Sequence, residues 1–219
     1  MIHAPGIQKV INALLYLNAA IVVFLASDSL GFSPHLPGLR AISVSVMVVS
    51  AMLFWIGSTP VFPWMCSLPL VWRVFPNIDG QYVIEVSSNW SLIHARQTGQ
   101  PEPPENDRLY KKVGKLTIKA RLLRIDISMR MDDGYSTSQT TMCMVLREGE
   151  NADPILSYVY KNNVRVPERT DSSHHFGAAR ITIPSVREPE LLEGHYWTDR
   201  NWQNALNTAG GIRLTRLKT

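Results

Sequence analysis

Hydrophobic residues form two long, almost uninterrupted segments near the N-terminus. They are VINALLYLNAAIVVFLAS, at about residues 10–27, and LRAISVSVMVVSAMLFWIG, at about residues 39–57. Each is close to the about 20 residues that an α-helix needs to cross the hydrocarbon core of a bilayer. The connecting DSLGFSPHLPG carries glycine and two prolines, which favour a turn. The pattern therefore predicts a hairpin of two transmembrane helices within residues 1–60.

The stretch at residues 61–76 predicts an interfacial linker. Trp64 and Trp72 suit a membrane surface, and Pro63 and Pro69 would interrupt a third crossing. The basic residues beyond the second segment favour an orientation with both ends of the hairpin in the cytoplasm. Two alternatives fit less well. A cleaved signal peptide would need a strongly basic start, and a buried helical hairpin would need apolar helices elsewhere to cover it.

Polar and small residues inside the apolar segments indicate helix contacts. Asn12 and Asn18 lie in or near the first segment, where an amide is costly in lipid unless it finds a partner. They bond either to the second helix of the same chain or to another copy of the chain, and the sequence favours neither. Ala41 and Ser45 form a small-xxx-small pair, a weak signal for close helix packing.

From Asn77 onward the hydrophobic period changes to two. In DGQYVIEV, Tyr82, Ile84 and Val86 alternate with more polar residues, as in a half-buried strand. Similar runs recur at 115–122, 124–131, 136–147, 155–161, 176–183, 195–200 and 210–218. About eight strands with short connections predict an antiparallel up-and-down barrel over residues 77–219, because closure removes exposed sheet edges. A two-sheet sandwich is the alternative.

Turn residues mark the ends of several predicted strands. Asp133-Gly134 is a strong hairpin signal, and Asn162-Asn163 suggests a further turn. Residues 91–110, which include QPEPPEND, are expected to form one longer loop.

Composition limits the functional classes without selecting one. The net charge of +4 over 219 residues suits an anionic ligand or lipid headgroup better than DNA or RNA. Cys66 and Cys143 give no disulfide framework, which favours a reducing compartment. The sequence lacks phosphate-loop and nucleophile-elbow motifs and any Cys/His spacing for a metal, so neither an enzyme nor a cofactor is predicted. His174 and His175 would point to opposite faces of a strand.

Two stretches near the C-terminus are the most specific local features: Gly194-x-Tyr196-Trp197-Thr198-x-Arg200, and Gly210-Gly211-Ile212-x-Leu214. With them, the chain resembles the two-transmembrane β-barrel effectors of bacterial cyclic-oligonucleotide-based antiphage signalling systems. The resemblance covers nearly the whole chain, and the order of two spans, aromatic linker and strand-rich domain carries more of it than either stretch.

The resemblance implies a function. A cyclic dinucleotide made by a partner nucleotidyltransferase during phage infection binds the cytoplasmic barrel. The protein, multi-pass in the bacterial inner membrane, then forms a homo-oligomer and disrupts the lipid bilayer, so that the cell dies before phage release. A membrane-tethered, lipocalin-like barrel for a lipid or other hydrophobic ligand is one alternative, and a scaffold that binds nothing is another.

A cyclic dinucleotide presents two phosphates and two bases, so its site needs cations and flat rings that face the barrel interior. Leu192, Gly194, Tyr196, Thr198 and Arg200 share one face, which we expect to point inward. A similar inward series is expected at Phe176, Ala178 and Arg180, and Trp90 is expected on the buried face of the first strand. The predicted ligand-binding residues are Trp90, Tyr158, Arg180, Tyr196, Thr198 and Arg200.

The barrel also resembles the calycin group, which includes the lipocalins. In that group an early Gly-x-Trp packs at the closed end, beneath a basic residue of the last strand. Gly80-x-Tyr82 would take the first part here, with tyrosine in place of tryptophan, and Arg216 or Lys218 the second.

Strand alternation separates the two Gly-x-Tyr stretches. Ile84 and Val86 continue the inward face after Tyr82 with apolar groups, whereas Thr198 and Arg200 continue it after Tyr196 with polar groups. We therefore expect Gly80-x-Tyr82 at the base of the barrel and EGHYWTDR at its mouth.

Overall fold

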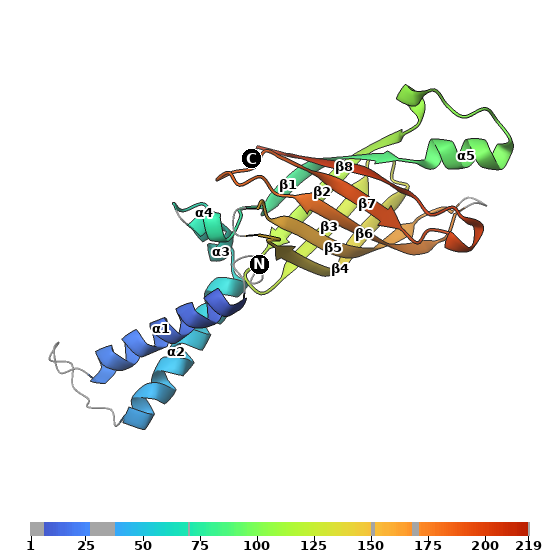
Figure 1. The fold of residues 1–219 in the computed structure, drawn as a ribbon. Helices are drawn as coiled ribbons and strands as arrows, with labels where there is room; N and C mark the ends of the chain where they lie inside the picture. Colours follow the sequence, from blue (N-terminus) through green and yellow to red (C-terminus); the bar gives the residue numbers. More distant parts are fainter. Residues whose placement is uncertain (1–6, 27–37, 70, 150–151, 168–170, 219) are drawn as a thin grey trace.

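The computed structural model describes residues 7–26, 38–69, 71–149, 152–167 and 171–218. Two long helices, α1 (Ile7–Ala26) and α2 (Gly38–Ser58), form a hairpin that projects from one end of a β-barrel (Figure 1). Two short helices, α3 (Val61–Cys66) and α4 (Val71–Val74), follow and lie at the same end of the barrel.

The hairpin occupies the segments that were predicted to be helical, but its predicted membrane crossing is not supported. In the part of the chain that the structure describes, no helix combines the length and the apolar character that crossing a bilayer requires. The first helix carries Gln8, Lys9, Asn12 and Asn18 among its apolar residues.

The two asparagines of α1 have different partners. The Ser45 hydroxyl on α2 lies 3.4 Å from the Asn18 Oδ1, and the Asn18 amide also donates to the Leu14 carbonyl at 2.9 Å. Asn18 thus bonds to the second helix of its own chain, which is one of the two expected arrangements. Asn12 instead accepts a hydrogen bond from Gln8, one turn earlier on the same helix, at 3.0 Å.

The linker packs against the barrel. Phe62 and Cys66 of α3 are buried in the same hydrophobic cluster as the barrel interior. Hydrogen bonds also join this region to barrel loops: the Leu122 amide donates to the Gly57 carbonyl at 3.1 Å, the Arg187 Nε to the Ser67 carbonyl at 2.8 Å, and the Arg147 guanidinium to the Arg73 carbonyl at 2.6 Å. Pro69 lies between α3 and α4 as expected, whereas Pro63 lies within α3 and does not interrupt it. Apolar residues on either side of these prolines cover the barrel base.

Eight antiparallel strands close into an up-and-down barrel in which each strand pairs with its neighbours in sequence and β8 pairs with β1. This confirms the predicted barrel and excludes the sandwich. The strands are β1 (Gly80–Ser88), β2 (Tyr110–Ala120), β3 (Ile125–Met131), β4 (Ser136–Leu146), β5 (Ile155–Val164), β6 (His174–Thr182), β7 (Leu191–Thr198) and β8 (Ala209–Arg216).

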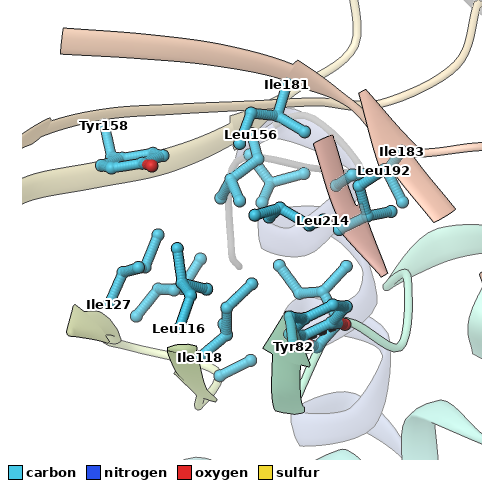
Figure 2. Close-up of a cluster of buried hydrophobic side chains, with 14 of the residues drawn as sticks. Tyr82, Leu116, Ile118, Ile127, Leu156, Tyr158, Ile181, Ile183, Leu192 and Leu214 are labelled. Atoms are coloured by element: carbon cyan, nitrogen blue, oxygen red, sulfur yellow. Dashed lines mark hydrogen bonds between the residues drawn. The ribbon is translucent and has the colours of Figure 1, made fainter. Parts of the chain in front are cut away.

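The interior is apolar toward the helices and polar toward the far end. Figure 2 shows the apolar half, in which Leu116, Ile118, Leu156, Ile181 and Leu214 from four strands are almost fully buried. Farther along the strands, inward positions become polar. They include Ser88, Ser136, Ser138, Asn162, His175 and Thr198. One end of the barrel is therefore a packed core, and the other is open to polar contacts.

The closed end is sealed by Arg216, as the calycin resemblance implied. Its guanidinium lies 5.2 Å from the centre of the Tyr82 ring. It donates to the Tyr82 hydroxyl at 2.8 Å and to the carbonyls of Asn77 and Asp79 at 2.5 and 2.9 Å. Gly80 has φ of +147°, so a side chain there would be strained. Lys218 lies beyond β8 and pairs with Glu190 at 3.0 Å, so Arg216 is the basic residue at the base.

Two expectations about loops need correction. The predicted loop at 91–110 contains a helix, α5 (Trp90–Thr98), and a 3₁₀ turn at Glu105–Asp107. The Asn162-Asn163 pair is not a turn but continues β5, because β4 and β6 both pair with it there. The Asp133-Gly134 hairpin is confirmed, with Gly134 at φ of +66°.

Candidate functional site: a cavity in the mouth of the barrel

The polar half of the barrel encloses a cavity of about 400 Å³, within the range of small-molecule sites. Its lining includes Trp90 at the start of α5, so it lies toward the end of the barrel that carries this helix. Figure 1 shows that end opposite the helical hairpin. The lining comes from all eight strands and from the loops between them. Residues far apart in the sequence meet here because strand pairing brings their inward faces around one space.

Tyrosine rings form part of the wall. The centres of the Tyr158 and Tyr160 rings lie 5.7 Å apart on the inward face of β5, and Tyr196 lies on β7. Burial raises the pKa of all three hydroxyls, so they stay protonated and neutral at physiological pH. Gly177 of β6 makes room for the Tyr160 ring, since a Cβ at that position would lie 2.4 Å from it. The wall thus offers flat faces without adding negative charge.

A first cation lies at the mouth on Arg200. Its guanidinium lies 4.3 Å from the centre of the Trp90 ring, and its Nε donates to the Asp171 Oδ1 at 2.8 Å. The Asp171 side chain is only 1% exposed, and the hydroxyl of Tyr135 donates to its other oxygen. These contacts hold the Arg200 guanidinium over the Trp90 ring, where the positive charge is attracted by the electrons of the ring face.

A second cation, Lys112, lies on the inward face of β2. Its Nζ donates to Asp133 at 2.9 Å and lies 4.3 Å from the centre of the Tyr135 ring. The hydrogen bond from Lys112 lowers the pKa of the Asp133 carboxyl, which therefore stays ionised. The mouth accordingly holds two cations, each beside an aromatic ring and each paired with a carboxylate.

Polar side chains continue the wall below the cations. Asn162 on β5 faces His175 on β6, with the amide Nδ2 and the imidazole Nε2 3.3 Å apart. Burial lowers the pKa of His175, which favours its neutral form. The exposed His174 lies on the other face, as expected for adjacent strand residues.

Five of the six predicted site residues line this cavity: Trp90, Tyr158, Tyr196, Thr198 and Arg200. Trp90 reaches it from the start of α5 rather than from β1. The Thr198 hydroxyl bonds to the Thr208 hydroxyl and carbonyl at 3.0 and 3.2 Å, so it also ties β7 to the start of β8.

The inward placement of Arg180 is wrong. It lies on the outer face of β6 and pairs with Glu148 at 2.5 Å, with about half of its side chain exposed. The expected inward series with Phe176 and Ala178 is shifted by one residue, and the inward positions are His175, Gly177, Ala179 and Ile181. FGAARITI is apolar on both faces at its centre, so alternation did not fix its direction.

Several lining residues were not anticipated: Lys112, Tyr135, Asn162, Asp171 and His175. Strand alternation could have indicated Lys112, because it places this residue on the same face of β2 as Leu116 and Ile118. Asn162 was hidden by the turn preference of an Asn-Asn pair. Nothing in the sequence places Asp171 beside Arg200, since that contact depends on the packing of two different loops.

The fold and the cavity define a receptor barrel for a small ligand, closed at one end and open at the other. A family model described as "Cap15, cyclic dinucleotide receptor domain" matches residues 74–216, and the chain belongs to this family of binding domains. The chain is also similar to the CD-NTase-associated protein 15 of Escherichia albertii. The two are 24% identical over 190 residues, which cover 82% of each chain.

Proposed function

We propose that this protein is an antiphage effector whose barrel mouth binds a cyclic dinucleotide made by a partner nucleotidyltransferase. Binding causes self-association, and the N-terminal helices then disrupt the bacterial inner membrane, with the barrel on the cytoplasmic side. One observation carries the proposal: a cavity of about 400 Å³ in which tyrosine rings line the wall and two cations lie at the opening. A ligand with stacked bases and two phosphates matches those groups.

The ion pairs at the mouth are compatible with a phosphate ligand. Arg200 uses Nε toward Asp171, and Lys112 uses one N–H toward Asp133. A guanidinium has five N–H donors and an ammonium three, so each cation can serve a phosphate while it keeps its carboxylate. The lipid-binding alternative is less favoured, because a cavity with two cations and a polar wall offers poor surroundings for a hydrocarbon chain.

The membrane step is supported by exposed apolar side chains on the hairpin. Leu15 and Tyr16 of α1 are 62% and 76% exposed, and Phe54 and Trp55 of α2 are 68% and 61% exposed. Exposed apolar surface of this kind marks contact with a membrane or another protein. We propose that self-association gathers these surfaces at the bilayer.

Calorimetric titration of the full-length protein with 3′,3′-cyclic dinucleotides tests the proposal. Arg200→Ala is expected to weaken binding at least about tenfold, since a hydrogen bond to a charged group contributes about 1.5–3 kcal/mol. Arg180→Ala is the matched control, because that arginine lies on the outer face, and its affinity should equal that of the wild type. Equal affinities for both variants would contradict the assigned site.

The same protein samples can be used to measure self-association and membrane disruption. Light scattering should show a larger mass with nucleotide than without it. Dye release from vesicles of phosphatidylethanolamine and phosphatidylglycerol should require nucleotide and should fail with Arg200→Ala. A mass that nucleotide does not change would exclude ligand-driven assembly.

A further inference from the structure

Two buried side chains in the cavity wall keep polar atoms without a protein partner. Asn162 and His175 are 8% and 9% exposed, and they lie directly opposite each other on β5 and β6. Their mutual contact uses the amide Nδ2 and the imidazole Nε2. The Asn162 Oδ1 and the His175 Nδ1 have no hydrogen-bond partner among the described residues. A buried polar group left unpaired costs about 1–3 kcal/mol, so these atoms need a partner from the cavity.

The hydrogen-bond donors and acceptors of the two side chains restrict which ligand group can be that partner. Burial has the largest effect on the pKa of His175 and lowers it, which favours the neutral imidazole. The nearby charged groups act in opposite directions: Asp171 and Asp199 raise this pKa, whereas Arg200 and His174 lower it. A neutral imidazole has one donor and one acceptor nitrogen. Whichever way the amide is turned, one contact between the two side chains leaves one donor atom and one acceptor atom unpaired within the wall of the cavity.

A phosphate does not match this arrangement, because its oxygens at neutral pH only accept. The Watson–Crick edge of a nucleobase does match it, since each common base carries a donor beside an acceptor there, in an order that differs between adenine or cytosine and guanine or uracil. The surroundings also suit a base. Tyr160 lies two residues before Asn162 on the same face of β5, and Gly177, two residues after His175, leaves space for its ring. A base stacked on this ring would present its edge to the pair.

We propose that Asn162 and His175 together read the hydrogen-bonding edge of one nucleobase and so determine which cyclic dinucleotide the barrel accepts. The proposal rests on the proposed function. It assigns different roles to two parts of the site: the cations at the mouth bind the charged sugar-phosphate ring, and the Asn162–His175 pair selects among bases.

The test measures selectivity rather than affinity alone. The full-length protein is titrated with cyclic di-GMP, cyclic di-AMP, cyclic di-UMP and 3′,3′-cyclic GMP-AMP, which share a backbone and differ only in bases. Asn162→Leu and His175→Leu are expected to lower the affinity ratio between the best and second-best nucleotide by about tenfold, since a paired base edge contributes about 1–3 kcal/mol of discrimination. His175→Gln keeps a donor and an acceptor, so it should retain more selectivity and gives a usable variant if the leucine changes impair folding.

The control is Lys161→Met, the next residue on β5, which is exposed on the outer face and should leave the ranking unchanged. Equal loss of affinity for all four nucleotides in the Asn162 and His175 variants would overturn the base-reading role while leaving the receptor function intact. An effect that follows the ribose hydroxyl, seen with 2′-deoxy analogues, would also overturn it. A wild-type protein that binds none of the four would instead count against the proposed function.

Discussion

Replacing Arg216 with methionine should strongly destabilise the barrel, although Arg216 lies far from the cavity. Methionine keeps much of the length and the apolar stem of the side chain but removes every N–H donor. The guanidinium donates to three backbone carbonyls, those of Asn77, Asp79 and Pro189, at 2.5, 2.9 and 3.3 Å. It also donates to the hydroxyl of Tyr82, a residue with no exposed surface, at 2.8 Å.

The expected loss in the free energy of unfolding follows from the groups that lose a hydrogen-bond partner when Arg216 is replaced. Each hydrogen bond to a charged group contributes about 1.5–3 kcal/mol, and a buried group left unpaired costs about 1–3 kcal/mol. These values do not add fully, because Arg216 is only partly buried and water will reach some of the carbonyls. We therefore expect a loss of about 3–5 kcal/mol in the free energy of unfolding, similar to breaking a buried charged contact. A typical domain has only about 5–15 kcal/mol in total.

Urea unfolding of the full-length protein, followed by circular dichroism, measures the loss. The matched control is Arg213→Met on the same strand. Arg213 pairs with Glu193 at 2.7 Å, but both side chains are more than half exposed, so its removal should cost less than about 1 kcal/mol. Tyr82→Phe should lie between the two, because the hydroxyl also donates to the Ile78 carbonyl at 3.0 Å. Equal unfolding midpoints for Arg216→Met and Arg213→Met would refute the idea that Arg216 seals the barrel.

Two further predictions concern the cavity wall. Burial lowers the pKa of His175 below its ordinary value of 6.5, so the unfolded chain binds a proton more readily than the folded one. The free energy of unfolding therefore does not depend on the protonation of His175 above about pH 6.5. Below that pH it decreases, by at most about 1.4 kcal/mol per pH unit. Melting temperatures of wild type and His175→Gln should therefore separate between pH 6.5 and 5, and parallel curves would contradict this. Gly177→Ala should push the Tyr160 ring into the cavity, since the new Cβ would lie 2.4 Å from it. Nucleotide affinity should then fall about tenfold while the unfolding midpoint changes little, and unchanged affinity would show that this ring does not contact the ligand.

Strand alternation was enough to predict the barrel and its two ends. Tyr82 and Ile84 continue an apolar face, whereas Tyr196, Thr198 and Arg200 end in polar groups, and the structure confirms base and mouth accordingly. The prediction worked where one face of a strand is clearly apolar and the other clearly polar. It failed at FGAARITI, where small residues on both faces remove the contrast, and Arg180 was placed inside instead of outside.

The sequence by itself determined the order of the parts: an apolar helical hairpin, a proline-containing linker and eight strands that pair in sequence order. These properties depend on local periodicity and short connections, which each segment carries alone. Only the tertiary structure decided that Asp171 holds Arg200 over Trp90 and that Asn162 faces His175. Such contacts depend on the register between strands and the packing of separate loops, and a register shift of a single residue would turn each side chain to the other face of the barrel.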